Sequence, residues 1–301
     1  MTADGKSPDA PPPVVSVLTT SYNHARWLPD TLDSVERQDY PHLEHIVVDD
    51  GSSDASTEIL AARANDRLSW SSTPHIGQAR ALNEAFQRSR GEIIGWLSSD
   101  DVYYDRRVVR DVVDAFRRHP EAGVVYGHAV LIDEVGLQLN AEWVPPMDVL
   151  GRQPPMQIYQ PAAFVRRSAI DESFVDESFD IAMDTELWLR IREAHRLVRL
   201  DRILAAERHQ PSRKSYTLGT LAAGELKRLD GSYRPSGGRS THRRHRAWGI
   251  AYRLAGLMLI PRMARHPTAF DGRLDGRFAL IGRQIAVPRS RISKRTPLDD
   301  R

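Results

Sequence analysis

The sequence predicts an α/β fold, with a mixed, mostly parallel sheet flanked by helices and a helical extension at the C-terminal end. Two observations predict it. Short apolar runs rich in β-branched residues alternate with amphipathic stretches over the first 130 residues, which is typical of βαβ units and a largely parallel sheet. The chain of 301 residues, 41% of them hydrophobic and 27% charged, is also long enough to bury a large core.

The expected elements follow from local patterns in chain order. The run 14–20 is apolar and β-branched, as in a buried parallel strand, and apolar residues then recur at helical spacing over 27–35. Further strands are expected at 43–48, 68–71, 92–97, 123–130, 162–165 and 198–206, the last as an edge strand, and further helices at 54–63, 78–88, 107–118 and 185–194. From residue 218 the chain is expected to be helical in part. Asn23 and Asp54 are suited to cap the helices that follow them.

The composition excludes several classes of function. The chain has no cysteine, which excludes disulfides, thiolate metal sites and cysteine nucleophiles, and its net charge of +2 gives no support for a nucleic-acid partner. No apolar run approaches the roughly 20 residues that span a bilayer, and the polar, proline-rich start is unlike a signal peptide. We therefore expect a cytoplasmic protein, with peripheral contact at the inner face of the membrane left open.

Polar clusters follow three of the expected strands, at 20–23, 49–52 and 99–101. Ligands bind outside the carboxyl ends of parallel strands, so chain folding would gather these clusters along one edge of the sheet. The adjacent acids Asp100 and Asp101 repel each other unless a cation lies beside them, and a divalent ion with a diphosphate is the natural occupant. A solvated turn is the alternative for one acidic pair, but two pairs at equivalent strand ends favour a site.

Five segments resemble, in order, the successive motifs of the family 2 glycosyltransferases, which have the GT-A fold, a Rossmann-like α/β architecture. The segments are Thr19–Asn23, Val48–Asp54, Gly91–Asp101, Asp184–Arg190 and His209–Ser215. The resemblance therefore covers roughly residues 14–216. It implies an enzyme that transfers a sugar, with inversion, from a nucleotide-diphosphate sugar to an acceptor hydroxyl in glycan or glycolipid biosynthesis.

The resemblance assigns five residues to the nucleotide. Asp50 matches the position that reads the base, since a carboxylate accepts an N–H from a pyrimidine or guanine edge. Asp49 matches a position that supports this loop or the ribose, and Asp100 one that binds the ribose. Thr20 and Tyr22 match positions that pack against the base.

Three further residues are implied in the chemistry. Asp101 matches the residue that holds a divalent cation, Mn²⁺ or Mg²⁺, and His209 matches a histidine that completes the metal or diphosphate site. Asp184 matches the catalytic base, because an acceptor hydroxyl must lose its proton as the new bond forms. A helix cap before Thr185 is the structural role open to Asp184, and the two roles are compatible.

Three residues depart from the family pattern. Many relatives carry an acidic residue or Asn where Ser99 stands, and many carry Asp in place of His75. Arg80 occupies a position that is often acidic. These departures leave the fold expectation intact but leave the donor sugar open, so no sugar-binding role is assigned to His75 or Arg80.

The resemblance and the patterns together divide the chain into four parts. We expect residues 1–13 to be disordered, 14–130 to bind the nucleotide sugar, 131–216 to carry the acceptor and catalytic part, and 217–301 to form a helical, basic extension. The expected partners are a nucleotide-diphosphate sugar donor and a glycan, lipid-linked or small-molecule acceptor.

Two alternatives are left open. The basic, aromatic segment Arg243–Met263 suits contact with an anionic membrane surface, but a helix that packs back on the catalytic domain is favoured over it. A catalytically silent module that binds a sugar nucleotide or polysaccharide has the same fold, although it would need neither Asp184 nor His209. A Rossmann dehydrogenase is disfavoured because no G-x-G-x-x-G follows the first strand.

Overall fold

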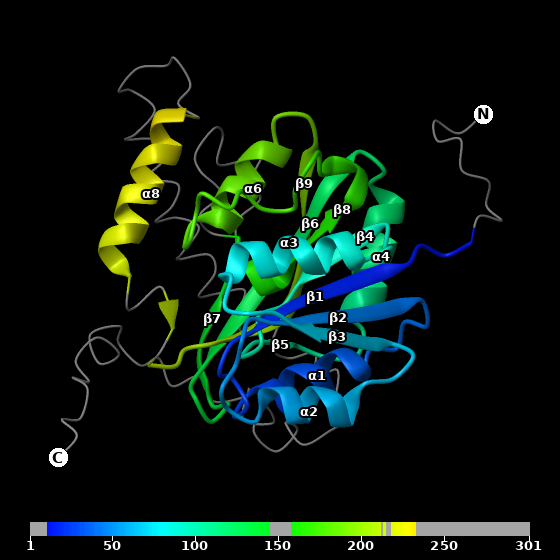
Figure 1. The fold of residues 1–301 in the computed structure, drawn as a ribbon. Coiled ribbons are helices and arrows are strands. Elements are labelled where there is room, and N and C mark those ends of the chain that lie inside the picture. The colour runs from blue at the N-terminus through cyan, green and yellow to red at the C-terminus, as the bar shows by residue number, and fades with distance from the viewer. Residues whose placement is uncertain (1–10, 145–157, 212, 215–217, 233–301) are drawn as a thin grey trace.

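The computed structural model describes residues 11–144, 158–211, 213–214 and 218–232. The strands are β1 (Val15–Ser21), β2 (Leu43–Asp49), β3 (Leu68–Ser72), β4 (Ile93–Trp96), β5 (Val102–Tyr103), β6 (Ala122–Ile132), β7 (Gln138–Glu142), β8 (Ala163–Arg166) and β9 (Arg196–Arg208). The helices are α1 (Leu28–Glu36), α2 (Ser56–Arg63), α3 (Gln78–Arg88), α4 (Val108–Arg118), α6 (Met183–Ile191) and α8 (Gly219–Ser232), with short 3-10 turns at Gln160–Ala162 and Arg167–Ala169. The elements form one mixed sheet with helices on both faces, as expected (Figure 1).

Strands β1 to β4 form the parallel half of the sheet, in the order β3-β2-β1-β4. They are the β-branched apolar runs of the sequence, and nearly every residue of β1, β2 and β4 is buried. The register places Ser21 opposite Asp49, and Asp49 opposite Ser72. The carboxyl ends of β1, β2 and β3 therefore meet at one edge of the sheet. The polar clusters expected at 20–23 and 49–52 lie at this edge.

The second half of the sheet mixes directions. Strand β8 runs antiparallel to both β4 and β6, and β9 runs parallel to β6. The two-residue strand β5 then pairs antiparallel with β9, with Val102 opposite Ala206 and Tyr103 opposite Ala205. The expectation of an edge strand at 198–206 is thus corrected, because β5 lies outside β9 in the sheet order. The pairing also brings the residues just before Val102 beside the end of β9.

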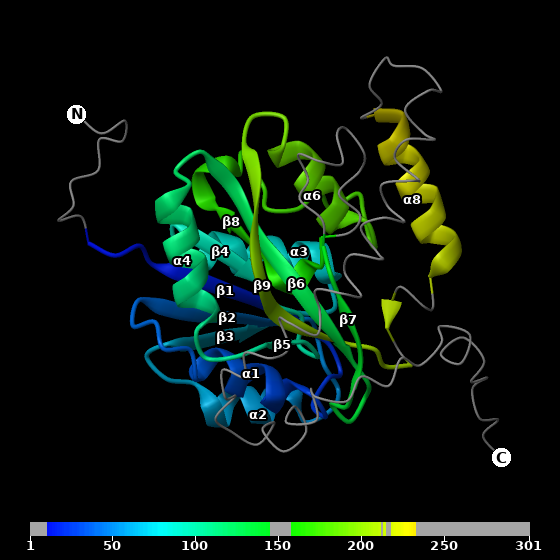
Figure 2. The same cartoon turned by 180° about the vertical axis from the view of Figure 1, so that it is seen from behind.

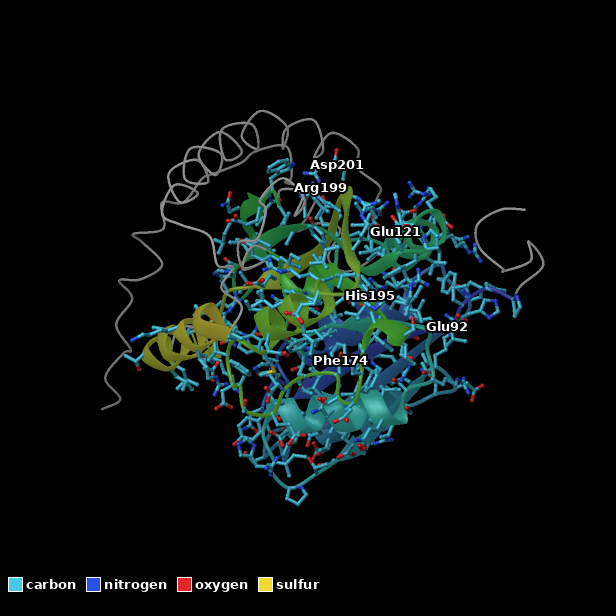
Figure 3. The ribbon with its side chains drawn as sticks, turned by 90° about the horizontal axis from the view of Figure 1, so that it is seen from above. Glu92, Glu121, Phe174, His195, Arg199 and Asp201 are labelled. Atoms are coloured by element: carbon cyan, nitrogen blue, oxygen red, sulfur yellow. The ribbon has the colours of Figure 1, made fainter. Side chains whose placement is uncertain are left out.

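The helices cover the two faces of the sheet in separate groups (Figures 1 and 2). Helices α3 and α6 pack on one face in the largest apolar cluster, which includes Leu82, Phe174 and Trp188. Helices α1, α2 and α4 lie on the other face. Figure 3 shows Phe174 between α3 and the sheet, where its ring lies 5.5 Å from that of Phe86 and 6.1 Å from that of Trp96. A fully buried side chain of this size contributes about 1.5–3 kcal/mol.

The capping predictions were wrong in detail. Asn23 lies four residues before the N-cap of α1, which is Trp27, so it cannot reach the helix and instead bonds to Ser53. Asp54 precedes the N-cap of α2, yet its Oδ1 accepts the backbone N–H of the first helical residue at 3.0 Å. Helix α6 begins two residues earlier than expected, which places Asp184 inside the first turn rather than at the cap.

The C-terminal part is described only through Ser232, where α8 confirms the helix expected from residue 218. Both views place α8 beside α6 (Figures 1 and 2). The segment Arg243–Met263, to which the sequence assigns either membrane contact or packing, lies outside the described residues. Among the described residues, no helix has the length and apolar character needed to cross a bilayer.

Candidate active site

The loop after β2 is built around two buried carboxylates. Asp49 is fully buried, and its Oδ2 accepts bonds from the backbone N–H of Ser52 at 3.0 Å and the hydroxyl of Ser72 at 2.9 Å. Of the two roles that the sequence allowed for Asp49, this geometry is that of a residue that supports the loop.

Asp50 holds a second loop against the first. Its Oδ1 accepts the backbone N–H of Ile76 at 2.7 Å, and its Oδ2 accepts that of Gly77 at 3.1 Å. The Nδ1 atom of His75 lies 3.0 Å from the same Oδ2. Both carboxylate oxygens thus already have donors from the 75–77 loop, so the residue predicted to read the base also holds this loop in place.

Gly51 is required where these loops meet, for two reasons. Its φ is +79°, in the region that favours glycine. A Cβ at this position would also lie 2.9 Å from the backbone nitrogen of His75 and 3.2 Å from the carbonyl oxygen of Thr73. Any side chain here would therefore push the 73–75 loop away from Asp50.

An aromatic surface stands at the end of β1. Tyr22 is 46% exposed, and its ring lies 4.4 Å from that of His75 at an interplanar angle of 30°. Thr20 is buried one strand position before the end of β1. Tyr22 and Asp50 therefore lie on the two sides of His75, and the three define a polar and aromatic wall at the edge of the sheet.

The second acidic pair lies after β4 and is almost fully buried, with Asp100 8% and Asp101 5% exposed. The side-chain amide of Gln210 donates to Asp100 Oδ2 at 3.2 Å, and the backbone N–H of Arg208 donates to Asp101 Oδ1 at 2.8 Å. Burial, with the neighbouring charges of Asp100 and Glu207, raises the pKa of Asp101 well above its ordinary value. A cation bound beside Asp101 would offset the repulsion between its carboxylate and those of Asp100 and Glu207.

Arg208 is the cation that holds this turn in place, and it is only 1% exposed. Its Nε donates to the carbonyl oxygen of Asp100 at 2.8 Å, and one terminal nitrogen pairs with Asp30 of α1 at 3.0 Å. The other terminal nitrogen reaches two carbonyl oxygens in the β6–β7 turn. One guanidinium thus fastens the end of β9 to the acidic turn, to α1 and to the β6–β7 turn.

Glu207, His209 and Arg213 follow on from the same strand end. Glu207 is buried, forms an ion pair with Arg213, and lies 3.5 Å from His209 Nε2. Burial acts to raise the pKa of Glu207, but the hydrogen bond from His209 and the charge of Arg213 outweigh it, so this pKa lies below its ordinary value. Glu207 is therefore an anion that faces both Asp101 and Arg213.

Asp184 lies in the first turn of α6. Its Oδ1 accepts the backbone N–H of Thr185 at 2.6 Å and the Thr185 hydroxyl at 3.2 Å. Burial raises its pKa to about 6, helped by the charge of Glu207 and opposed by Thr185 and Arg213. A carboxylate with a pKa near neutrality is suited to take a proton from a bound hydroxyl.

Two groups connect the predicted metal residue to the predicted base. Glu207 raises and Arg213 lowers the pKa of both Asp101 and Asp184, so each of these two acids lies within electrostatic reach of Glu207 and Arg213. The fold thus brings residues that are 83 positions apart in the sequence to one site. His209 joins this group through Glu207.

The donor set at this cluster fits a hard divalent cation. Asp101 turns Oδ1 to the backbone of Arg208, and its Oδ2 accepts no hydrogen bond from the described residues. Within the described parts of the chain, no three His, Asp or Glu side chains converge as a closed coordination shell. Mg²⁺ and similar ions are commonly held by one or two carboxylates together with substrate phosphates, so an open carboxylate of this kind matches that chemistry.

The residues that depart from the family pattern have structural partners. The Ser99 hydroxyl lies 2.7 Å from His24 Nδ1, and Arg80 Nε lies 3.2 Å from Glu177 Oε2 on the exposed side of α3. His75 also has partners, Tyr22 and Asp50, and they belong to the wall described above.

A separate cavity of about 480 Å³ lies at the other end of β2. Its lining includes Leu43 and His45 from the start of that strand, Arg63 from the end of α2 and Arg67 from the loop between α2 and β3. Neither of the two acidic pairs contributes a residue to this lining.

Sequence reasoning missed Glu207, Arg208 and Gln210, which all contact the acidic turn or its neighbours. The pattern that would have found them is the one that predicted a site after β1, β2 and β4, namely a polar cluster at the end of a parallel strand. Strand β9 is parallel to β6 and ends in such a cluster.

Comparisons with known proteins agree with this geometry. The profile of the family described as "Glycosyl transferase family 2" matches residues 16–174, slightly more than half of the chain. The chain belongs to this family. An uncharacterized glycosyltransferase of Rickettsia felis is 33% identical over 139 residues, which are 46% of this chain and 23% of that protein. The putative teichuronic acid biosynthesis glycosyltransferase TuaG of Bacillus subtilis is 39% identical over 98 residues, 30% of this chain and 36% of that protein.

A structural likeness supports the same fold for nearly the whole chain. The mannosyltransferase PcManGT from Pyrobaculum calidifontis, solved in complex with GDP-Man and Mn²⁺, matches with a TM-score of 0.59 at 19% identity. The match covers 92% of this chain and 83% of that one. The alignments with the two curated relatives span only about a quarter to a third of their length, so this family 2 member shares one part of larger proteins.

Proposed function

We propose that this family 2 member is an inverting glycosyltransferase, which moves a sugar from a nucleotide-diphosphate sugar to an acceptor hydroxyl. The observation that carries the proposal is that Arg213 pairs with Glu207 and lies within electrostatic reach of Asp101 and Asp184. The polar and aromatic wall of Tyr22, His75 and Asp50 stands at the same edge of the sheet. These side chains would bind the nucleotide, stabilise the charge of the diphosphate and take the proton of the acceptor hydroxyl.

In the proposed reaction, Asp184 takes the proton of the acceptor hydroxyl as the oxygen attacks the anomeric carbon of the donor sugar. The bond from that carbon to the diphosphate oxygen breaks, and its electron pair leaves with the nucleoside diphosphate. Attack on the face opposite the leaving group inverts the anomeric centre, and no covalent enzyme intermediate is needed.

Asp101 and His209 would hold a divalent cation, which would stabilise the negative charge on the leaving diphosphate. Arg213 is a cationic side chain at this cluster, and it forms an ion pair with Glu207. We assign it a second contact with the diphosphate, because guanidinium groups bind phosphate oxygens with two donors. The nucleobase packs on Tyr22, and Asp50 keeps its wall in place.

The proposal includes a role in polysaccharide biosynthesis, since one curated relative is named for teichuronic acid biosynthesis. A GDP-sugar is one candidate donor, because the Pyrobaculum enzyme was solved with GDP-Man. UDP- and dTDP-sugars are the others, and the acceptor is a glycan, a lipid-linked sugar or a small molecule.

The test is turnover by wild type and by Asp184→Asn, measured as release of nucleoside diphosphate from a panel of UDP-, GDP- and dTDP-sugars with a mixture of glycan and lipid-linked acceptors. We expect the substitution to lower kcat by roughly 10²–10⁴-fold, because the hydroxyl loses its proton acceptor. Nucleoside diphosphate affinity should change by no more than about twofold.

Asp171→Asn is the matched control, since Asp171 is exposed and outside the site. It should leave both quantities unchanged. Turnover by Asp184→Asn at the wild-type rate would show that the base is another residue. Tight nucleotide binding without turnover on any donor would favour the silent binding module.

A further inference from the structure

Glu225 lies on α8, and its carboxylate is bound by three consecutive backbone N–H groups. Its Oε1 accepts the N–H of Asp180 at 2.8 Å, and its Oε2 accepts those of Ile181 at 2.9 Å and Ala182 at 2.8 Å. Only 6% of Glu225 is exposed. Hydrogen bonds to a charged acceptor are about twice as strong as neutral ones, and a buried carboxylate with three donors is firmly held.

These three groups lead directly into α6, the helix of Asp184. The first N–H groups of a helix have no partner inside the helix, and a side chain at the N-cap commonly supplies one. The N-cap of α6 is Ala182, which has no polar side chain. Glu225 bonds the N–H of this residue from another helix, and it also places a negative charge at the positive end of α6.

Further contacts fix α8 itself on the same loop. Leu229 is buried in the cluster formed by α3 and α6. The guanidinium of Arg228 lies 3.7 Å from the ring centre of Phe179 and donates to the carbonyl oxygen of Ser178 at 2.9 Å. Helix α8 therefore packs on residues 178–182, and Glu225 binds the part of this loop that leads into α6.

We propose that Glu225 is a positioning residue for Asp184: by binding the 180–182 backbone, it sets where α6 begins and hence where the base stands. This inference rests on the proposed function. Asp184 follows Ala182 by two residues, so any movement of the 180–182 loop would displace the Asp184 carboxylate. The part of the chain beyond residue 217, expected to be an extension, thereby helps to build the catalytic centre.

The experiment compares Glu225→Ala and Glu225→Gln in the full chain with the control Glu172→Gln, which changes an exposed glutamate outside the site. We expect Glu225→Ala to lower kcat by roughly 10- to 100-fold, because small displacements of a catalytic group have effects of this size. The KM for the donor should change by less than about threefold, since the wall of Tyr22, His75 and Asp50 is built by loops that Glu225 does not contact. Glu225→Gln keeps the shape and one acceptor oxygen, so it should recover part of kcat.

Hydrogen exchange supplies a readout that does not depend on activity. The amides of residues 180–182 should be protected in wild type and in Glu172→Gln, and should exchange faster in Glu225→Ala while the amides of β1 and β2 stay protected. Unchanged exchange at 180–182, or a kcat equal to that of wild type, would overturn the positioning role.

The two proposals fail in different ways. If Asp184→Asn keeps full turnover, the assignment of the base is wrong, whatever the exchange result. If Asp184→Asn is inactive but Glu225→Ala retains wild-type kcat with exposed 180–182 amides, the base is correct and the positioning role is wrong. A loss of kcat in Glu225→Ala that only matches a loss of folded protein, measured by circular dichroism, would also contradict it.

Discussion

At the scale of single residues, the site depends on how one cation is shared among buried carboxylates. Asp101, Asp184 and Glu207 all lie within the influence of Arg213, yet only Glu207 forms an ion pair with it. Glu207 accordingly has a lowered pKa, whereas those of Asp101 and Asp184 are raised. The ion pair therefore favours the charged form of Glu207, whereas burial favours the neutral forms of Asp101 and Asp184.

The raised pKa of Asp184 predicts the pH dependence of the reaction. Only the deprotonated carboxylate can accept the proton of the acceptor hydroxyl, and burial places its pKa at about 6. We expect kcat/KM to rise tenfold per pH unit below this value and to level off above it. The measurement is kcat/KM from pH 4.5 to 8.5; a profile flat across pH 6 would contradict the role of Asp184.

Stability provides a check on the same group without any substrate. A folded-state pKa above the ordinary value means that the folded protein binds this proton more tightly than the unfolded chain does. Stability contributed by Asp184 is therefore complete below pH 4 and is lost as the pH rises towards about 6. Relative to Asp184→Asn, wild type should lose roughly 1–3 kcal/mol of unfolding free energy over this interval.

At the scale of elements, the short pairing of β5 with β9 assembles the site. Val102 follows Asp101, and its partner Ala206 precedes Glu207, so the ladder itself sets the two acids side by side. The backbone N–H of Arg208 then donates to the side-chain Oδ1 of Asp101 and ties this acid to the end of β9. The two halves of the candidate site are thus joined by strand register.

Arg208 should accordingly be critical for stability, and we predict the effect of Arg208→Met. The substitution leaves Asp30 and the turn carbonyls without their buried cation, which typically costs about 3–5 kcal/mol. Arg196→Met is the control from the same strand, because Arg196 pairs with Glu121 at an exposed position. It should cost no more than about 1 kcal/mol.

Urea unfolding of the two variants measures the difference directly. Equal midpoints for Arg208→Met and Arg196→Met would mean that the buried guanidinium does not hold the turn. Arg208→Lys should rescue little, because an ammonium cannot bind the turn carbonyls and Asp30 together.

The elements show why the sequence predicted some features and missed others. Strands β1 and β2 have seven residues each and β4 has four, and the three are apolar and buried, so their pattern is clear, and the polar clusters at their ends followed from it. Strand β5 has two residues, and β7 has only one buried residue in five, so neither shows the alternation of apolar and polar residues that predicts a strand. The burial of Arg208 depends on register between distant segments, which no local pattern encodes.

At the scale of the whole molecule, the sheet unites residues from most of the described chain in one candidate site. The family match ends at residue 174, before Asp184, Glu207 and α8. The sequence separated 14–130, 131–216 and 217–301, a division that stays a prediction, but the contacts of Glu225 tie α8 to the start of α6. These contacts join one side chain to backbone N–H groups far away in the sequence, and for that reason composition could not predict them.

The central claim is that Asp101 holds a divalent cation for a nucleoside diphosphate at this edge of the sheet. Isothermal titration calorimetry with UDP, GDP and dTDP, each with and without Mn²⁺, tests it most directly in wild type, Asp101→Ala and the control Asp171→Ala. We predict that at least one nucleotide binds with one-to-one stoichiometry, and that Mn²⁺ tightens binding by about tenfold or more, equivalent to about 1.4 kcal/mol, in wild type and the control but not in Asp101→Ala. Binding of no nucleoside diphosphate, or an Mn²⁺ effect that survives in Asp101→Ala, would contradict the claim.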